Sequence, residues 1–339
     1  MEGTEVAVMS TAFQIRQPGI HLVGKNQDVM YPNVYLFTNQ RGLRKTALMR
    51  PPVVPAGWIS AYGSLTVSQV GKESPNGGIN EAGLVVEQTT LWGTEYPGAD
   101  DRPALGELAW MQYLLDTCST VGEALEAALA VRIDQSTSKL HYLLADRSGD
   151  RAIVECLQGK CVVHRELGEL PILTNTAYAE AAQSSRVGGE KAPSKGDYER
   201  NSMERFRIIA DRVQTQWDGG RRVDQAYEAL AAARREDTVF SLVYDLERME
   251  LHAMTARHGE RAMIRMADFD FAKEAPAQAA DLQRLQAGQQ NALFEPYSAA
   301  FNLNVVRSFF RDPVLTSVFK WDLPDEMLRF LASYPDSFE

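Results

Sequence analysis

Residues 9–28 read MSTAFQIRQPGIHLVGKNQD, and the architecture proposed for the chain follows from this stretch. Apolar residues run through 11–15 and again through 20–23, which is typical of two neighbouring strands. A short hairpin would return the second strand antiparallel beside the first. The end of the second strand would then place Lys25 and Asp28 near Ser10. We therefore expect a hydroxyl that lies beside a cation and a carboxylate, a combination used for nucleophilic chemistry.

The rest of the chain alternates between strand-rich and helical segments. Leu, Ala, Trp and Tyr at helical spacing predict two consecutive helices over 104–118 and 121–131, with Ser119-Thr120 as a cap between them, and two more over 203–217 and 223–235. The polar stretch 181–195 is typical of an exposed loop. Further strands are predicted at 83–87, 140–145, 152–156, 162–164, 239–246, 250–256 and 262–266.

This order of elements favours two stacked antiparallel sheets between helical layers over a parallel dinucleotide-binding fold. No GxGxxG or GxxxxGK[ST] motif opens a helix, which agrees. From Lys273 the composition shifts to Ala, Gln and Leu and then to an aromatic-rich end. We expect residues 273–339 to be a helical extension packed on the same domain.

Charge and hydropathy exclude several classes of function. The 339 residues carry 35 Lys+Arg against 45 Asp+Glu, a formal charge of −10. This acidic excess repels phosphate backbones and anionic head groups, and no basic run offsets it locally, so nucleic acids and membranes are not expected as partners. No stretch has the length and hydropathy of a membrane span, and the first nine residues lack the pattern of a signal peptide.

The cysteines and histidines form no familiar site. Cys118, Cys156 and Cys161 include no CxxC pair, so no structural metal is expected. Cys156 and Cys161 flank a predicted hairpin loop; they could pair in an oxidising compartment, although two reduced strand residues are the favoured interpretation. The five histidines are scattered and no HExxH or GxSxG occurs, so a histidine triad has little support.

Residues 9–13, 24–28 and 78–84, followed by four later blocks, occur in an order that resembles a known family, the choloylglycine hydrolases. This family includes bile salt hydrolases and penicillin V acylases, and it belongs to the N-terminal nucleophile hydrolases. Residues 9–13 (MSTAF) are similar to the family's opening, in which a catalytic cysteine is followed by threonine. Residues 24–28 (GKNQD) and 78–84 (GINEAGL) are similar to its Gly-Arg/Lys-Asn-x-Asp and Gly-Met-Asn-Glu-x-Gly-Leu elements. Later blocks match at Leu140 to Asp146, Leu173 to Asn175, Glu204 to Phe206 and Ser241 to Asp245.

The resemblance implies a four-layer αββα fold and a self-processing enzyme. Family members cut their own chain before the nucleophile, and the new α-amino group, with a pKa near ~8, then acts as the base. It follows that residues 1–9 are a propeptide, that residues 10–272 form the catalytic domain, and that Ser10 becomes the new N-terminus.

Position 10 departs from the family pattern, because relatives have cysteine there. Either the serine is native and the enzyme is of a serine type, or it replaces a cysteine so that the precursor stays uncut and inactive. A hydroxyl needs more help than a thiol to lose its proton, which favours the trapped precursor.

The resemblance also assigns roles to other residues. Lys25 would steady the ionised nucleophile, Asp28 would bind the new α-amino group, and Arg205 would organise carboxylates at the site. Asn175 and Thr90 would bind the oxyanion, Thr90 through its backbone N–H. Four aromatic residues lie in stretches that would wall an acyl pocket, with core packing as the equal alternative: Trp58, Tyr62, Trp92 and Tyr96.

The sequence therefore predicts hydrolysis of a linear non-peptide amide without a metal or organic cofactor. The expected substrate is an N-acylated amine or amino acid, such as a conjugated bile salt, penicillin V or an acyl homoserine lactone. The rivals are a catalytically silent member of the fold that binds acyl ligands, and an acyltransferase that uses the same site. Relatives are often homotetramers, and they occur in both the bacterial cytoplasm and periplasm, so oligomeric state and compartment stay open.

Overall fold

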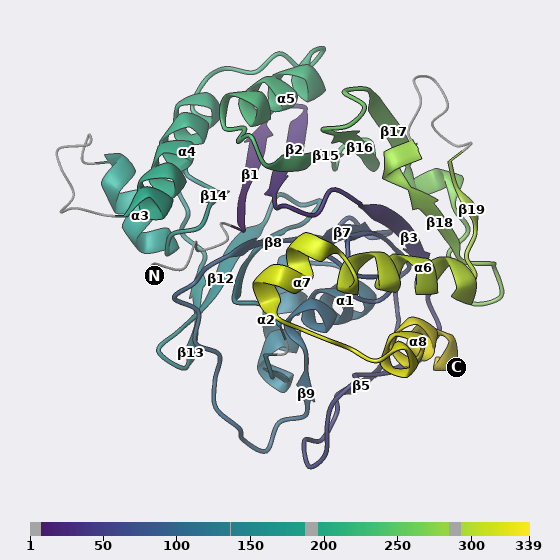
Figure 1. The fold of residues 1–339 in the computed structure, drawn as a ribbon. Coiled ribbons are helices and arrows are strands. Elements are labelled where there is room, and N and C mark those ends of the chain that lie inside the picture. Colours follow the sequence, from purple (N-terminus) through teal and green to yellow (C-terminus); the bar gives the residue numbers. More distant parts are fainter. Residues whose placement is uncertain (1–7, 136, 187–195, 285–292) are drawn as a thin grey trace.

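The computed structural model describes residues 8–135, 137–186, 196–284 and 293–339. Two antiparallel sheets stack on one another, with helices on their outer faces (Figure 1). The first sheet has the strand order β14 (Ile172–Leu173), β1 (Met9–Gln17), β2 (Ile20–Asp28), β15 (Thr238–Asp245), β16 (Glu250–Thr255) and β17 (Arg261–Arg265).

The second sheet is longer and curves beneath the first. Its order is β13 (Lys160–His164), β12 (Arg151–Leu157), β11 (Leu140–Ala145), β8 (Val85–Thr90), β7 (Gly77–Asn80), β6 (Ser64–Ser68), β3 (Tyr35–Asn39), β18 (Gln278–Asp281) and β19 (Glu295–Pro296). Two small pairs lie outside both sheets, β4 (Arg44–Thr46) with β5 (Gly57–Ile59), and β9 (Ala104–Leu105) with β10 (Arg132–Ile133).

Helices cover the two outer faces. Beside the first sheet lie α3 (Tyr178–Arg186), α4 (Asp197–Val213) and α5 (Arg222–Ala232), of which α4 contacts β1 and α5 contacts β2 and β15. Beside the second lie α1 (Glu107–Thr117) and α2 (Val121–Ala130). The αββα layering predicted from the sequence is therefore confirmed (Figure 1).

Two apolar clusters hold these layers together. The larger cluster contains Phe13, Leu22 and Val243 of the first sheet together with Leu36, Val85 and Leu143 of the second, all of them buried. The smaller cluster joins the second sheet to α1 and α2 through residues such as Trp110 and Tyr142. Alternate residues of β8 contribute to each cluster, Val85 to the larger and Val86 to the smaller, because successive side chains of a strand point to opposite faces.

The chain from residue 273 onward differs from a purely helical extension. It forms α6 (Ala299–Phe310), α7 (Pro313–Phe319) and α8 (Asp325–Ser333), but β18 also pairs with β3 and so lengthens the second sheet. Ala279 and Ala280 are buried there, which a composition rich in Ala and Gln did not reveal. None of the described helices is long and apolar enough to span a bilayer.

Three local predictions need correction. The helix expected from Ala104 begins at Glu107, because residues 104–105 pair with β10. The loop expected over 181–195 is helical as far as Arg186, since Tyr178 and two small alanines pack against the core; residues 187–195 lie outside the described residues. Cys156 and Cys161, expected to be reduced, face one another across β12 and β13 and form a disulfide.

The predicted cap at Thr120 is confirmed, because its side chain accepts the N–H of Glu123.

Candidate active site

The first two strands bring the predicted site together at one end of the first sheet. Ser10 is opposite Gln27 and Met9 is opposite Asp28 in the β1–β2 register. Asn175 follows β14, which pairs with β1 from the other side, and Arg205 reaches in from α4. The six residues predicted to act in catalysis are all buried: Ser10, Lys25, Asp28, Thr90, Asn175 and Arg205.

Ser10 directs its hydroxyl toward the peptide bond that precedes it. Its Oγ lies 2.5 Å from the carbonyl oxygen of Met9 and 3.2 Å from Oε1 of Gln27, so two acceptors compete for one hydrogen. Its backbone N–H donates to Oδ1 of Asn175 at 3.0 Å. The hydroxyl is therefore adjacent to the group that a self-cleavage reaction would attack.

Asn175 and Thr90 meet at the carboxyl end of β8. Nδ2 of Asn175 donates to the carbonyl oxygen of Thr90 at 2.8 Å, which leaves the second hydrogen of the amide available. Leu140 of β11 is opposite Thr90, yet its N–H donates to the Tyr96 hydroxyl and its carbonyl accepts from Thr94.

This arrangement fixes the direction of the Thr90 backbone. The two groups of Leu140 point away from Thr90, so this is a pair without mutual hydrogen bonds, and the N–H and C=O of Thr90 both point to its other side. That is the side on which Asn175 lies. The Thr90 N–H is consequently on the side of β8 where the Asn175 amide lies.

Arg205 joins the nucleophile to the amide. Its Nη1 donates to the carbonyl oxygen of Ser10 and to Oγ1 of Thr11, both at 2.6 Å, and its Nη2 donates to Oδ1 of Asn175 at 2.7 Å. Burial lowers the pKa of Arg205 to about 10, which still leaves it charged near neutrality. Its nearest carboxylate, Asp28, is 3.9 Å away, so Arg205 mainly orients backbone and amide groups.

Asp28 has one satisfied and one unsatisfied carboxylate oxygen. Its Oδ1 accepts the hydroxyl of Thr238 at 2.6 Å, while Oδ2 has no hydrogen-bond partner among the described residues. Burial raises the pKa of Asp28, against the opposing effect of Arg205. A buried oxygen without a donor is uncommon and marks a position where a further donor would be stabilising.

Lys25 points across to the second sheet. Its ammonium donates to the carbonyl oxygen of Gln88 and lies 3.4 Å from Oε2 of Glu87. The Tyr244 hydroxyl donates to the other oxygen of Glu87 at 2.6 Å. Burial lowers the pKa of Lys25 and raises that of Glu87, since burial disfavours both charges. Within the described part of the chain no hydrogen bond joins Lys25 to Ser10.

Two of the four aromatic residues predicted to wall an acyl pocket pack in the core. Trp58 and Tyr96 pack against the cluster that joins α1 and α2 to the second sheet, and the Trp58 indole donates to Asp116 at 2.7 Å. Core packing, the alternative considered for them, accounts for their positions. Tyr62 is half-buried before β6, and Trp92 is 43% exposed just beyond Thr90. For these two the pocket assignment stays a prediction.

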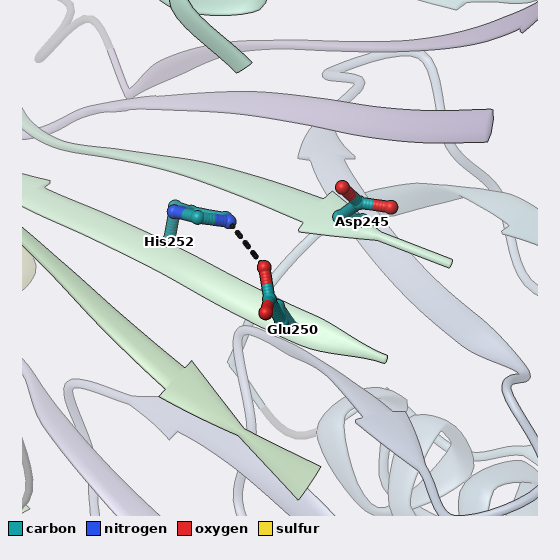
Figure 2. A group of neighbouring side chains, drawn as sticks. All are labelled: Asp245, Glu250 and His252. Atoms are coloured by element: carbon teal, nitrogen blue, oxygen red, sulfur yellow. Dashed lines mark ion pairs between the residues drawn. The ribbon is translucent and has the colours of Figure 1, made fainter. Parts of the chain in front are cut away.

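One group of described residues has the side chains of a metal site. Asp245, Glu250 and His252 lie close together at the far end of β15 and on β16 (Figure 2). Arg222 donates to Asp245 at 2.8 Å, Arg265 lies 3.5 Å from Glu250, and His252 lies 3.3 Å from Glu250. Arg222 compensates Asp245, whereas Glu250 has only these longer ion pairs and its Oε2 has no hydrogen-bond partner among the described residues. We interpret the group as a buried ion-pair cluster.

Sequence reasoning missed several residues that complete the site. Gln27 occupies the variable position of the GKNQD block, and its contact with Ser10 follows only from the strand register. Glu87 sits in an apolar-looking strand and pairs with Lys25 from the opposite sheet. Ser202, which lies on α4, accepts a hydrogen bond from the N–H of Asn175 at 2.8 Å. Each contact joins two different secondary-structure elements, so no local sequence pattern predicts it.

Known proteins resemble this chain in sequence over part of its length. Residues 19–183, just under half of the chain, match the family described as linear amide C–N hydrolases, choloylglycine hydrolase family. A curated relative, penicillin V acylase of Pectobacterium atrosepticum, is 34% identical over 135 residues. That alignment spans 35% of this chain and only 36% of the relative.

Solved structures share the fold over a much larger part of the chain. A penicillin V acylase from Agrobacterium tumefaciens superposes with a TM-score of 0.70 at 24% identity, over 85% of this chain and 98% of that one. A variant of the conjugated bile acid hydrolase from Clostridium perfringens gives 0.63 at 15% identity, over 82% and 98%. At these identities the similarity establishes the fold alone.

Proposed function

We propose that this chain, which belongs to the choloylglycine hydrolase family of linear amide C–N hydrolases, hydrolyses a linear non-peptide amide of the N-acyl amine or N-acyl amino acid type. The observation that carries the proposal is the setting of Ser10, whose hydroxyl lies beside the Met9 carbonyl and whose N–H is held by Asn175. The names of the similar proteins place penicillin V and conjugated bile acids among the substrate classes to test.

The first reaction would be cleavage of the chain before residue 10. The Ser10 Oγ attacks the carbonyl carbon of Met9, the bond from that carbon to the Ser10 nitrogen breaks, and an ester to Oγ forms in its place. Water then hydrolyses the ester, which releases residues 1–9 and frees the α-amine of Ser10. Residues 1–7 of this propeptide lie outside the described residues. The unsatisfied Oδ2 of Asp28 is a suitable acceptor for the new amine.

Turnover would then use the same atoms on an external amide. The free α-amine, with a pKa near ~8, accepts the proton of Oγ as Oγ attacks the substrate carbonyl. The developing oxyanion receives hydrogen bonds from the Thr90 N–H and from Nδ2 of Asn175. The proton passes to the leaving amine, and water completes the cycle by hydrolysing the acyl-enzyme. Lys25 would contribute positive charge near the oxyanion site, because its ammonium donates to the carbonyl oxygen of Gln88, two residues before Thr90 in β8.

We further propose that the chain is a precursor in which serine occupies the position of a nucleophilic cysteine. A thiol ionises near ~8.5 and attacks while only partly ionised, whereas a hydroxyl depends on full proton removal by a base. In the uncut chain the nitrogen of residue 10 is an amide and has no basic lone pair to offer. Self-cleavage by Ser10 should therefore be slow, and Ser10→Cys should restore it.

Mass spectrometry of the parent chain, Ser10→Cys and Ser10→Ala tests both parts of the proposal. We expect Ser10→Cys to lose residues 1–9 and to release amine from a panel containing penicillin V, a glycine-conjugated bile salt and an acyl homoserine lactone. Ser10→Ala should stay uncut and inactive.

If the parent also matures and turns over, the serine is a working nucleophile and the precursor proposal is wrong. If Ser10→Cys binds an acyl amide without cleaving it, the chain is a silent binder. If product forms only with an added acceptor amine, it is an acyltransferase.

A further inference from the structure

His141 of β11 lies at the point where the two sheets meet behind the proposed oxyanion site. His141 is opposite Thr89 in the β11–β8 register. Its Nε2 lies 2.5 Å from Oγ1 of Thr89 and 2.9 Å from the carbonyl oxygen of Thr174. The Thr89 hydroxyl also donates to that carbonyl. One imidazole therefore contacts both the end of β8 and the segment that follows β14.

Glu155 of β12 fixes the orientation of this imidazole. Its Oε1 lies 2.8 Å from Nδ1 of His141 and accepts the N–H of Tyr178 at 2.8 Å, and its Oε2 lies 3.0 Å from Nε2 of His164. Burial alone would raise the pKa of Glu155, but hydrogen bonds from the two histidines outweigh burial and lower the pKa to about 2. Because a carboxylate only accepts, Nδ1 is the donor in its contact.

The opposite ring nitrogen is thereby aimed at Thr174. Nε2 lies within hydrogen-bond distance of both the Thr174 carbonyl and the Thr89 hydroxyl. A ring protonated on both nitrogens donates to Thr174, and a ring protonated on Nδ1 alone accepts the Thr89 hydroxyl, so Nε2 is bonded to this pair of residues in either form. The His141 and Glu155 side chains are completely buried, so no solvent competes for these bonds. Ser202 holds the neighbouring N–H of Asn175 from the other side, through α4.

The residues joined in this way immediately precede the two proposed oxyanion donors. Thr89 precedes Thr90, whose N–H points toward the site, and Thr174 precedes Asn175, whose amide contacts the Thr90 carbonyl. We propose that His141, held by Glu155, is a positioning residue that sets the separation of the Thr90 N–H and the Asn175 amide. Among the residues that the structure describes, no hydrogen bond joins His141 to Ser10, so His141 acts through Thr89 and Thr174.

A positioning role for His141 has a kinetic consequence that a purely structural role lacks. Donors in an oxyanion site act on charge that develops in the transition state, and small displacements of such groups have large effects on rate. A change at His141 should therefore lower kcat while KM stays close to that of the parent. General loss of folding would instead lower the amount of active enzyme and the melting temperature. It would not produce different kcat values for two His141 substitutions that each keep the hydrogen bonds of one ring nitrogen.

Two substitutions at His141 each keep the hydrogen bonding of only one ring nitrogen. His141→Gln places an amide near the position of Nε2, where it can donate to Thr174 or accept from Thr89. His141→Asn places an amide near the position of Nδ1 and keeps only the contact with Glu155. His252→Gln is the matched control, a mostly buried histidine at the far end of the first sheet with a carboxylate partner of its own. All variants are made in the parent and in the Ser10→Cys chain, and only matured protein, verified by its new N-terminus, is assayed.

We expect His141→Asn to lose about 10- to 100-fold in kcat with KM within about twofold of the parent, and His141→Gln to recover most of the loss. His252→Gln should stay within about twofold in both constants. The inference rests on the proposed function. Equal kcat values for His141→Asn, His141→Gln and an active parent would overturn the inference alone. Absence of amide hydrolysis in both parent chains would overturn the proposed function and, with it, this inference.

Discussion

The backbone N–H of Ser10 and the side-chain oxygen of Asn175 form a 3.0 Å hydrogen bond across 165 positions of sequence. The same Asn175 side chain donates to Thr90 on the second sheet. One amide therefore connects the proposed nucleophile on its own sheet to the proposed oxyanion donor on the other. The relative position of these two groups depends on how the sheets stack.

Asn175→Ala should impair catalysis far more than folding. It removes one oxyanion donor and the acceptor for the Ser10 nitrogen, and loss of a single such donor lowers kcat by ~10²- to 10³-fold. Steady-state kinetics in the matured Ser10→Cys background measures this. Asn33→Ala, which removes an amide bonded to Ser308 far along the chain, is the control. A kcat within threefold of the parent would remove Asn175 from the mechanism.

Lys25→Met should be strongly destabilising because it leaves Glu87 buried without its cation. Removal of one partner of a buried ion pair lowers the free energy of unfolding by about 3–5 kcal/mol. The double variant Lys25→Met/Glu87→Gln should recover a large part of that loss, since the stranded charge is gone. Urea unfolding of both single variants and the double variant measures the coupling, and strictly additive effects would contradict the pairing.

Glu155 should make the fold acid-sensitive in a defined window. Its pKa is lowered from 4.5 to about 2 in the folded chain. A carboxylate with a lowered folded pKa stabilises the protein above its unfolded pKa, and that contribution disappears as pH falls from about 4.5 toward 2. The amount is on the order of 3 kcal/mol. Chemical unfolding between pH 7 and pH 3 should show a shallower acid decline for Glu155→Gln than for the parent, and parallel curves would show that Glu155 does not titrate in this way.

Gly24→Ala should destabilise the hairpin that carries the site. Gly24 is opposite Phe13 in the β1–β2 register, and a Cβ at position 24 would lie 2.5 Å from the end of the Phe13 ring. Overpacking of this kind lowers the free energy of unfolding by about 1–3 kcal/mol. Thermal unfolding should show that Phe13→Leu relieves part of the effect, whereas Gly98→Ala, which meets open space, leaves the midpoint unchanged.

Local patterns were sufficient to predict most of the fold. Alternating and continuous apolar runs located β1 and the β15 to β17 series to within about two residues, and they located the start of β2, which continues five residues beyond the run at 20–23. Helical spacing located α2 and α5, and it located α4 with both ends displaced by four to six residues. The site residues were located by short blocks that resemble a known family, and the hairpin register then explains why Ser10, Lys25 and Asp28 belong to one region.

The remaining features depend on packing between segments distant in sequence. β18 has a composition typical of a helix, and it is a strand because the exposed edge of β3 offers it a partner. Glu87 carries no sequence signal of its own, since its partner Lys25 comes from the other sheet. His141 lies in the block 140–146 that resembles the family, but its contact with Thr174, which follows β14, is not evident from that block. Lys25 itself was expected at the nucleophile, but the strand on which it lies directs its side chain to Gln88 and Glu87.

Met9, the residue on the amino side of the proposed scissile bond, is only 2% exposed, and its sulfur lies 3.4 Å from the Arg205 guanidinium. Its side chain therefore fills interior volume directly beside the groups assigned to catalysis. Removal of the leader would empty that volume at the moment the amine is freed. A single hydrolytic event would thus supply both the base and the first part of the chamber into which an acyl chain enters.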